Sequence, residues 1–138
     1  NRDLRNIDLS RANLRNANLS NANLKGIDLS HSDLTGATMY CTNLEGAHLD
    51  NATLEDTNLE NAHLVRATLI RANLKRARMS GVNLNQADLR DADLKHADLS
   101  SAQMRRTRLS SADLSHANLE QANLRQARIR QAKLQDTK

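Results

Sequence analysis

Apolar residues recur along the whole chain with a period of five. All 23 leucines occupy positions that begin at residue 4 and continue in steps of five, and the four gaps in this series hold Met39, Met79, Met104 and Ile129. All 19 alanines lie two residues before one of these 27 central positions. Asn or Asp directly precedes the central residue in 17 of the 27 repeats, so the repeat reads A-(N/D)-L-x-x. Because the series has no insertion, residues 1–138 are predicted to form a single domain.

A period of five fits neither a regular helix nor a straight strand. On an α-helix, five residues rotate a side chain by about 140°, which would scatter the leucines around the helix. On a straight strand, successive leucines would alternate between the two faces. A bend in every repeat keeps all of them on one side. Strand alternation within each repeat then turns Leu and Ala inward and leaves three residues facing solvent, which predicts a coiled, all-β chain.

The bend is predicted at the second residue after each central position. All four glycines occupy this position, as do eight Asn or Asp residues. These residue types tolerate a positive φ, which a type II turn requires at its third residue. Other repeats have Arg, Gln, His or Ser there, and for some of these we expect type I or irregular corners.

The repeat resembles that of the pentapeptide-repeat family, as in Ala12-Asn13-Leu14 and Ala92-Asp93-Leu94, and the resemblance covers the whole chain. It is strongest to bacterial members, especially cyanobacterial ones. The resemblance implies a right-handed quadrilateral β-helix with four repeats per coil and about seven coils. Neither end of the repeat array has a cap, so we expect flanking sequence outside these residues, which would make them the repeat core of a slightly longer protein, or end-to-end self-association.

Composition adds few constraints. The chain has one Tyr, no Phe or Trp, and a mean hydropathy of −0.70. Its one cysteine, Cys41, excludes an internal disulfide. No apolar run approaches the roughly 18 residues of a membrane span, and no signal-peptide pattern is present. A cytoplasmic location is favoured, while export stays open because the chain begins at Asn1 rather than Met.

Charge is distributed unevenly when residues 20 apart are placed on the same side of the coil. The side that contains Leu24, Leu44 and Leu64 has seven basic and two acidic residues, a net charge of +5 within a total of +4. The other three sides sum to +1, −1 and −1. The candidate interaction surface combines basic residues of this side with two outward apolar residues on adjacent sides of one coil: Arg5, Lys25, Arg66, Arg105, Arg106, Arg125, Val65 and Ile70.

The repeat pattern does not predict a catalytic site or a metal site. His96 and His116 are 20 residues apart and are predicted to stack outward near Asp93 and Asp113. Two histidines without a third ordered ligand fall short of a zinc site, so no metal or cofactor is predicted. Inward positions filled by Leu and Ala leave no pocket, so no catalytic residue and no enzyme activity are predicted.

The favoured function is a non-enzymatic protein-binding or scaffold module, a rigid rod with one basic face whose partner is a protein of unknown identity, an acidic protein being one candidate. One alternative is a nucleic-acid-associated or DNA gyrase-directed regulator, and another is a structural spacer in a larger protein. Family members that bind gyrase resemble duplex DNA in being strongly acidic, whereas this chain is basic. No aromatic residues interleave the arginines and no helix is available for a major groove, so nucleic-acid binding would be directed at the backbone.

Overall fold

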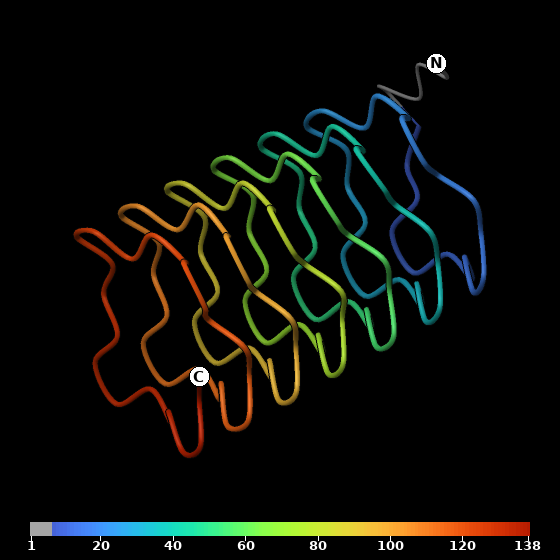
Figure 1. The fold of residues 1–138 in the computed structure, drawn as a ribbon. Coiled ribbons are helices and arrows are strands. Elements are labelled where there is room, and N and C mark those ends of the chain that lie inside the picture. The colour runs from blue at the N-terminus through green and yellow to red at the C-terminus, as the bar shows by residue number, and fades with distance from the viewer. Residues whose placement is uncertain (1–6) are drawn as a thin grey trace.

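The computed structural model describes residues 7–138 as a rod of stacked coils, in which the first described coil (blue) and the last (red) lie at opposite ends (Figure 1). The described residues contain no helix, and each repeat has one bridging residue between turns. Every bridge is parallel and joins residues 20 apart, from Asp8 with Asp28 to Asp113 with Lys133. A coil therefore takes four repeats and has four sides, which confirms a β-helix.

Backbone hydrogen bonds use four of the five amides in each repeat. In the repeat centred on Leu74, the Leu74 amide donates to the Asp93 carbonyl of the next coil (2.7 Å), and the Asn73 amide donates to the Ala52 carbonyl of the previous coil (2.9 Å). The second residue after the centre also donates to the next coil. The Ala77 amide closes the turn by donating to the Leu74 carbonyl (3.1 Å). Three bonds per repeat thus join neighbouring coils.

The fifth amide explains the preference for Asn or Asp before the central residue. It belongs to the residue after the centre, and the backbone offers it no acceptor. In all 16 described repeats with Asn or Asp at the preferred position, the side-chain oxygen accepts from this amide two residues on, as Asn73 Oδ1 does from Lys75 (3.2 Å). The repeat therefore contains a built-in Asx turn that completes its hydrogen bonding.

The expectation of mixed corner types is wrong. All 26 described corner residues have a positive φ between 52° and 68°, although only four of them are glycine. A left-handed conformation costs a non-glycine residue roughly 1–2 kcal/mol. Each corner amide, however, donates to a carbonyl of the next coil where a next coil follows, as Arg71 does to Arg90 (3.0 Å). The stacking of coils therefore imposes one turn geometry on every residue type.

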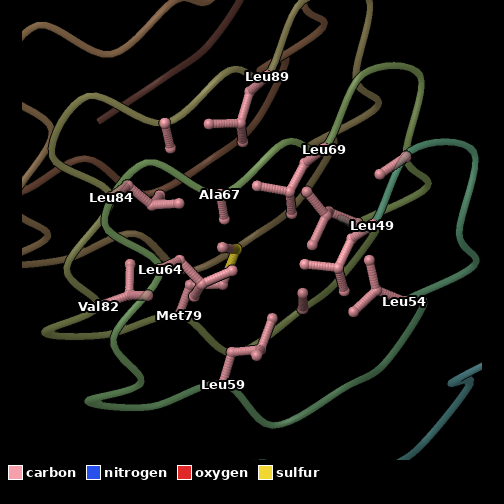
Figure 2. Close-up of a cluster of buried hydrophobic side chains, with 14 of the residues drawn as sticks. Leu49, Leu54, Leu59, Leu64, Ala67, Leu69, Met79, Val82, Leu84 and Leu89 are labelled. Carbon is pink, nitrogen blue, oxygen red and sulfur yellow. The ribbon is translucent and has the colours of Figure 1, made fainter. Parts of the chain in front are cut away.

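The core is a continuous column of central side chains and small residues. Central residues from Leu24 to Leu114 are at most 1% exposed, and Figure 2 shows Leu49, Leu54, Leu59 and Leu64 pointing inward from successive sides of the rod. Three threonines replace alanine in the core, and each hydroxyl donates to the carbonyl of a central residue 23 positions earlier at 2.8–3.0 Å: Thr42, Thr57 and Thr107. Within residues 7–138, no buried side-chain polar atom lacks a partner.

Candidate functional site

On two of the four sides, opposite charges from neighbouring coils neutralise each other. The third face carries the central residues Leu34, Leu54 and Leu74, and the fourth carries Met39, Leu59 and Met79. Every lysine and arginine of these faces between residues 12 and 136 has a carboxylate within 4.0 Å: Arg15, Lys75, Arg76, Arg78, Lys95 and Lys133. Between residues 12 and 136, these two faces therefore have no lysine or arginine without a carboxylate partner.

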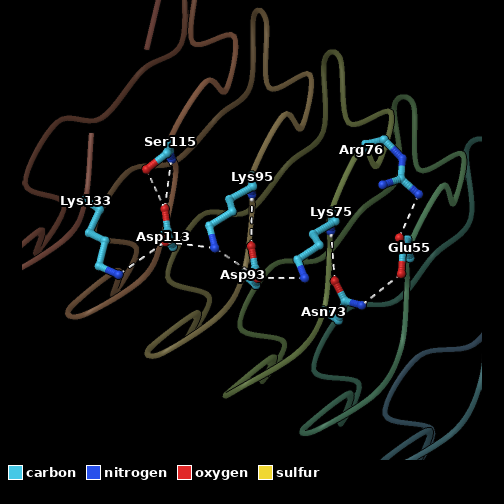
Figure 3. A network of polar contacts seen from close by, with 9 residues as sticks. All are labelled: Glu55, Asn73, Lys75, Arg76, Asp93, Lys95, Asp113, Ser115 and Lys133. Atoms are coloured by element: carbon cyan, nitrogen blue, oxygen red, sulfur yellow. Dashed lines mark hydrogen bonds and ion pairs between the residues drawn. The ribbon is translucent and has the colours of Figure 1, made fainter. Parts of the chain in front are cut away.

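Figure 3 shows the most extended of these arrangements, a ladder along the third face. Lys95 Nζ lies 3.7 Å from Asp93 Oδ2 and 3.3 Å from Asp113 Oδ2, and Lys133 Nζ lies 3.4 Å from Asp113. Burial raises the pKa of Asp113, but hydrogen bonds from the Ser115 hydroxyl (2.6 Å) and amide (3.1 Å), together with Lys95, outweigh this effect. The pKa of Asp113 therefore lies well below its usual range.

Stability is expected to fall in acid. The pKa of Asp33 is lowered to about 2 by hydrogen bonds from Thr35 and by Arg15, and that of Asp113 is also lowered. An unfolded aspartate titrates near pH 3.9. Because the folded pKa is the lower one, these groups stabilise the fold fully above about pH 4, and this contribution is lost as the pH falls through 2. Urea denaturation at a series of pH values should show a midpoint that decreases below about pH 4.

Asp113→Asn is the matched control for this prediction. Asn keeps the Asx turn, as Asn118 does by accepting from the Glu120 amide (3.1 Å), but it cannot titrate. The variant should lose part of the dependence on pH while remaining folded at neutral pH. An unchanged pH profile would show that the lowered pKa of Asp113 does not contribute to stability.

The other two sides carry the excess charge, and only in their C-terminal half. The first face contains Leu24, Leu44 and Leu64, and the second contains Leu29, Leu49 and Leu69. From residue 62 to 131 these two faces carry two aspartates, Asp88 and Asp91, and nine exposed arginines: Arg66, Arg71, Arg90, Arg105, Arg106, Arg108, Arg125, Arg128 and Arg130. The net charge there is +7. The same faces between residues 7 and 51 have two basic and four acidic residues.

The first and second faces meet in a corner that is hollowed between its side chains. We call this feature the arginine corner and define it by Arg66, Gln86, Arg106 and Gln126, which succeed one another every 20 residues, and by Arg108 and Arg128 beside them. These residues line a hollow of about 640 Å³. Arg66 Nε donates to Gln86 Oε1 (3.2 Å), and Arg106 Nε donates to Gln126 Oε1 (2.8 Å). A neutral amide thus holds each of these two guanidinium groups.

Asp88 is the one carboxylate that lines the hollow, and its charge is already matched. Arg90 Nε and Nη2 donate to its two oxygens, both at 2.8 Å, and Arg108 Nη1 lies 3.4 Å away. Burial raises the pKa of Asp88, which is 8% exposed, but the bonds from Arg90 outweigh this and lower the pKa overall. Within residues 7–138, the remaining seven arginines have no carboxylate partner: Arg66, Arg71, Arg105, Arg106, Arg125, Arg128 and Arg130.

The candidate residues chosen from the sequence divide into three groups. Arg66, Arg105, Arg106 and Arg125 are exposed on the first face within the basic half. Lys25 lies toward the other end of the rod and pairs with Glu45 (3.1 Å), whereas Arg5 lies outside the described residues.

Val65 and Ile70, the apolar members of the candidate surface, are half-buried. Sequence reasoning missed Arg108, Arg128 and Arg130 on the second face because five aspartates elsewhere on that face reduce its net charge to +1. Totalling charge along the rod as well would have found them.

The histidine pair stacks as predicted. The rings of His96 and His116 are 4.9 Å apart with 7° between their planes, and His116 Nδ1 lies 3.6 Å from Asp136 Oδ2. Over residues 7–138, no three His, Cys, Asp or Glu residues are grouped in a way that would hold a metal ion. The same residues include no helix with the length and apolar character of a membrane span.

The fold and the corner define a class of protein: a four-sided β-helical solenoid with one basic corner. Two family models match the chain, one described as pentapeptide repeats over residues 1–30 and 12–51, the other as a pentapeptide repeat region over residues 52–129. The chain belongs to the pentapeptide-repeat family. No curated protein is significantly similar to it in sequence.

Solved structures of the family superpose on the whole rod. HetL, a pentapeptide repeat protein involved in heterocyst differentiation regulation in the cyanobacterium Nostoc sp. strain PCC 7120, is 30% identical with a TM-score of 0.65, and the match covers 99% of this chain and 78% of HetL. A trypsin-treated form of QnrB1, a plasmid-mediated fluoroquinolone resistance protein, is 16% identical with a TM-score of 0.61, covering 99% of this chain and 88% of QnrB1. The likeness to QnrB1 shows the fold alone.

Proposed function

We propose that this protein is a non-enzymatic binding module that presents the basic half of its first and second faces to an acidic protein partner. One observation carries the proposal: among the described residues, seven arginines in the basic half of these two faces have no carboxylate partner, while the cations of the third face are paired. Unpaired charge of one sign attracts a partner of the opposite sign and orients its approach. The similarity to HetL, which is involved in heterocyst differentiation regulation, supports a regulatory role.

A binding role also fits the shape of the rod. Inward positions are filled by Leu, Ala and hydrogen-bonded Thr, and the hollow at the arginine corner is lined mainly by Arg and Gln. Asp88, which is held by Arg90, is committed to an ion pair rather than to acid–base chemistry. We also retain the expectation of right-handed coils, about seven in number.

Affinity capture from a lysate of the source cells tests this function. The bait is the chain itself, compared with Arg105→Glu/Arg125→Glu on the first face and with Lys75→Glu/Arg78→Glu on the paired faces. We expect a protein that the chain captures to be lost with the first variant and retained with the second.

Nuclease treatment of the same lysate separates this function from its alternatives. Capture that disappears after nuclease treatment would favour a nucleic-acid partner. Equal capture by the chain and by both variants would contradict a role for the basic faces, and no capture at all would favour a structural spacer.

A further inference from the structure

We propose that the arginine corner binds a short acidic segment of a partner protein, whose carboxylates are bound by Arg66, Arg106 and Arg128. This inference rests on the proposed function and adds to it a location on the rod and a ligand chemistry. The hollow at this corner, about 640 Å³, gives a chain segment a place to lie.

The glutamines at the corner leave the arginines ready for a ligand. Because Gln86 and Gln126 accept only from Nε of Arg66 and Arg106, four of the five N–H donors of each guanidinium remain available. The terminal nitrogens of a guanidinium match the two oxygens of a carboxylate. Holding the side chain at Nε also reduces the conformational freedom that binding would remove.

The equivalent position on the third face shows what a carboxylate does instead. There Arg76 is preceded 20 residues earlier by Asp56, which binds its Nε (2.9 Å) and Nη2 (2.8 Å), and Glu55 binds Nη2 as well (2.6 Å). Three of the five N–H donors of Arg76 are therefore used, and two carboxylates of its own chain neutralise its charge. A carboxylate on the neighbouring coil neutralises an arginine, as Asp56 does Arg76, whereas an amide such as Gln126 holds Arg106 without neutralising it.

The length of the basic region favours a short acidic segment over duplex nucleic acid. Arg66 and Gln126 are three coils apart, about 14 Å at the usual strand spacing. Beyond them toward the N-terminus, the same faces carry Asp28, Glu45 and Asp50. A long polyanion lying along the rod would meet these carboxylates, whereas an extended peptide of about five residues would not.

The test uses a fluorescently labelled hexaglutamate peptide and fluorescence anisotropy at low salt. Gln86→Glu/Gln126→Glu should neutralise Arg66 and Arg106 in the way that Asp56 neutralises Arg76. We expect this variant to bind the peptide about tenfold more weakly than the unmodified chain, with a thermal unfolding midpoint that is equal or higher. Gln121→Glu/Gln135→Glu makes the same change in net charge at exposed positions outside the corner and should bind within about twofold of the unmodified chain.

The remaining outcomes each decide a separate question. If the corner variant binds the peptide normally while Arg105→Glu/Arg125→Glu does not, the location is wrong and the proposed function of the basic faces stands. If the unmodified chain does not bind hexaglutamate, the proposal of an acidic ligand is wrong. The proposed function is still tested separately by affinity capture from the lysate. A 12-base-pair duplex DNA that displaces the peptide and binds more tightly would overturn the choice of an acidic segment.

Discussion

Replacing Leu74 by alanine should lower the free energy of unfolding by about 2–5 kcal/mol. Leu74 is completely buried in the middle of the rod. The walls around it cannot collapse onto the cavity, because the Leu74 and Asn73 amides donate to carbonyls of the coils on either side. A solenoid has only nearest-neighbour coils to compensate for a defect. The cost is measured by urea denaturation followed by circular dichroism.

Leu134→Ala is the matched control, since it removes the same atoms from the same repeat position. Leu134 is 42% exposed in the last described coil, so its truncation should cost less than about 1.5 kcal/mol. Equal losses for the two variants would contradict the view that the central column is the main source of stability. A negligible loss for Leu74→Ala would show that the coils can move together to fill the space.

The period of five predicted the core with unusual completeness. It placed every Leu and Ala inside, and Leu24 to Leu114 are indeed buried. The period predicts the buried positions because burial depends on the position of a residue within the repeat, and very little on the types of the solvent-facing residues. The number of repeats per coil came from the family resemblance, and the bridges between residues 20 apart confirm it.

The positions of the corners were predicted from the sequence, but their uniform geometry and the Asx turns were not, for different reasons. Residue types such as Arg71 and Ser101 do not favour a positive φ on their own, so their uniform geometry follows from hydrogen bonds to the next coil. The role of Asn73 and its equivalents follows from counting amides in three dimensions. Once four of five amides have backbone partners, the fifth is left without one, and an Asn or Asp side chain two residues earlier can accept from it.

The candidate site was predicted in part because placing charges on faces needs only the 20-residue coil. That step found Arg66 and Arg106 on one face. It could not show that Arg76 is bound by Asp56 whereas Arg106 is bound by Gln126, since this depends on which side chains meet across coils. Net charge per face gives only the balance of basic and acidic residues, and contacts between coils decide which arginines lack a carboxylate partner.

A deletion between residues 62 and 131 should distinguish what the fold requires from what peptide binding at the arginine corner requires. Removing one repeat, residues 97–101, leaves every remaining Leu and Ala at its inward position, so the rod should stay folded at a cost of about 1–2 kcal/mol from ion pairs that no longer align. All later residues, however, move by one face relative to the earlier ones. Arg106 would then follow Gly81 instead of Gln86, and the hollow would be broken. We expect normal cooperative unfolding and loss of hexaglutamate binding.

Removing only Ser101 should be far more damaging. Ser101 is a corner residue with a φ of 57°, and without it the turn cannot form and strand alternation is shifted by one residue. A leucine would have to face solvent, so the loss should exceed that of Leu74→Ala. Removing a whole coil far from the corner, residues 27–46, should preserve both folding and binding. Urea denaturation and hexaglutamate binding of the three deletion variants test this ranking of stability and binding. An equal loss of stability for the five-residue and one-residue deletions would show that contacts specific to each face determine how the coils stack.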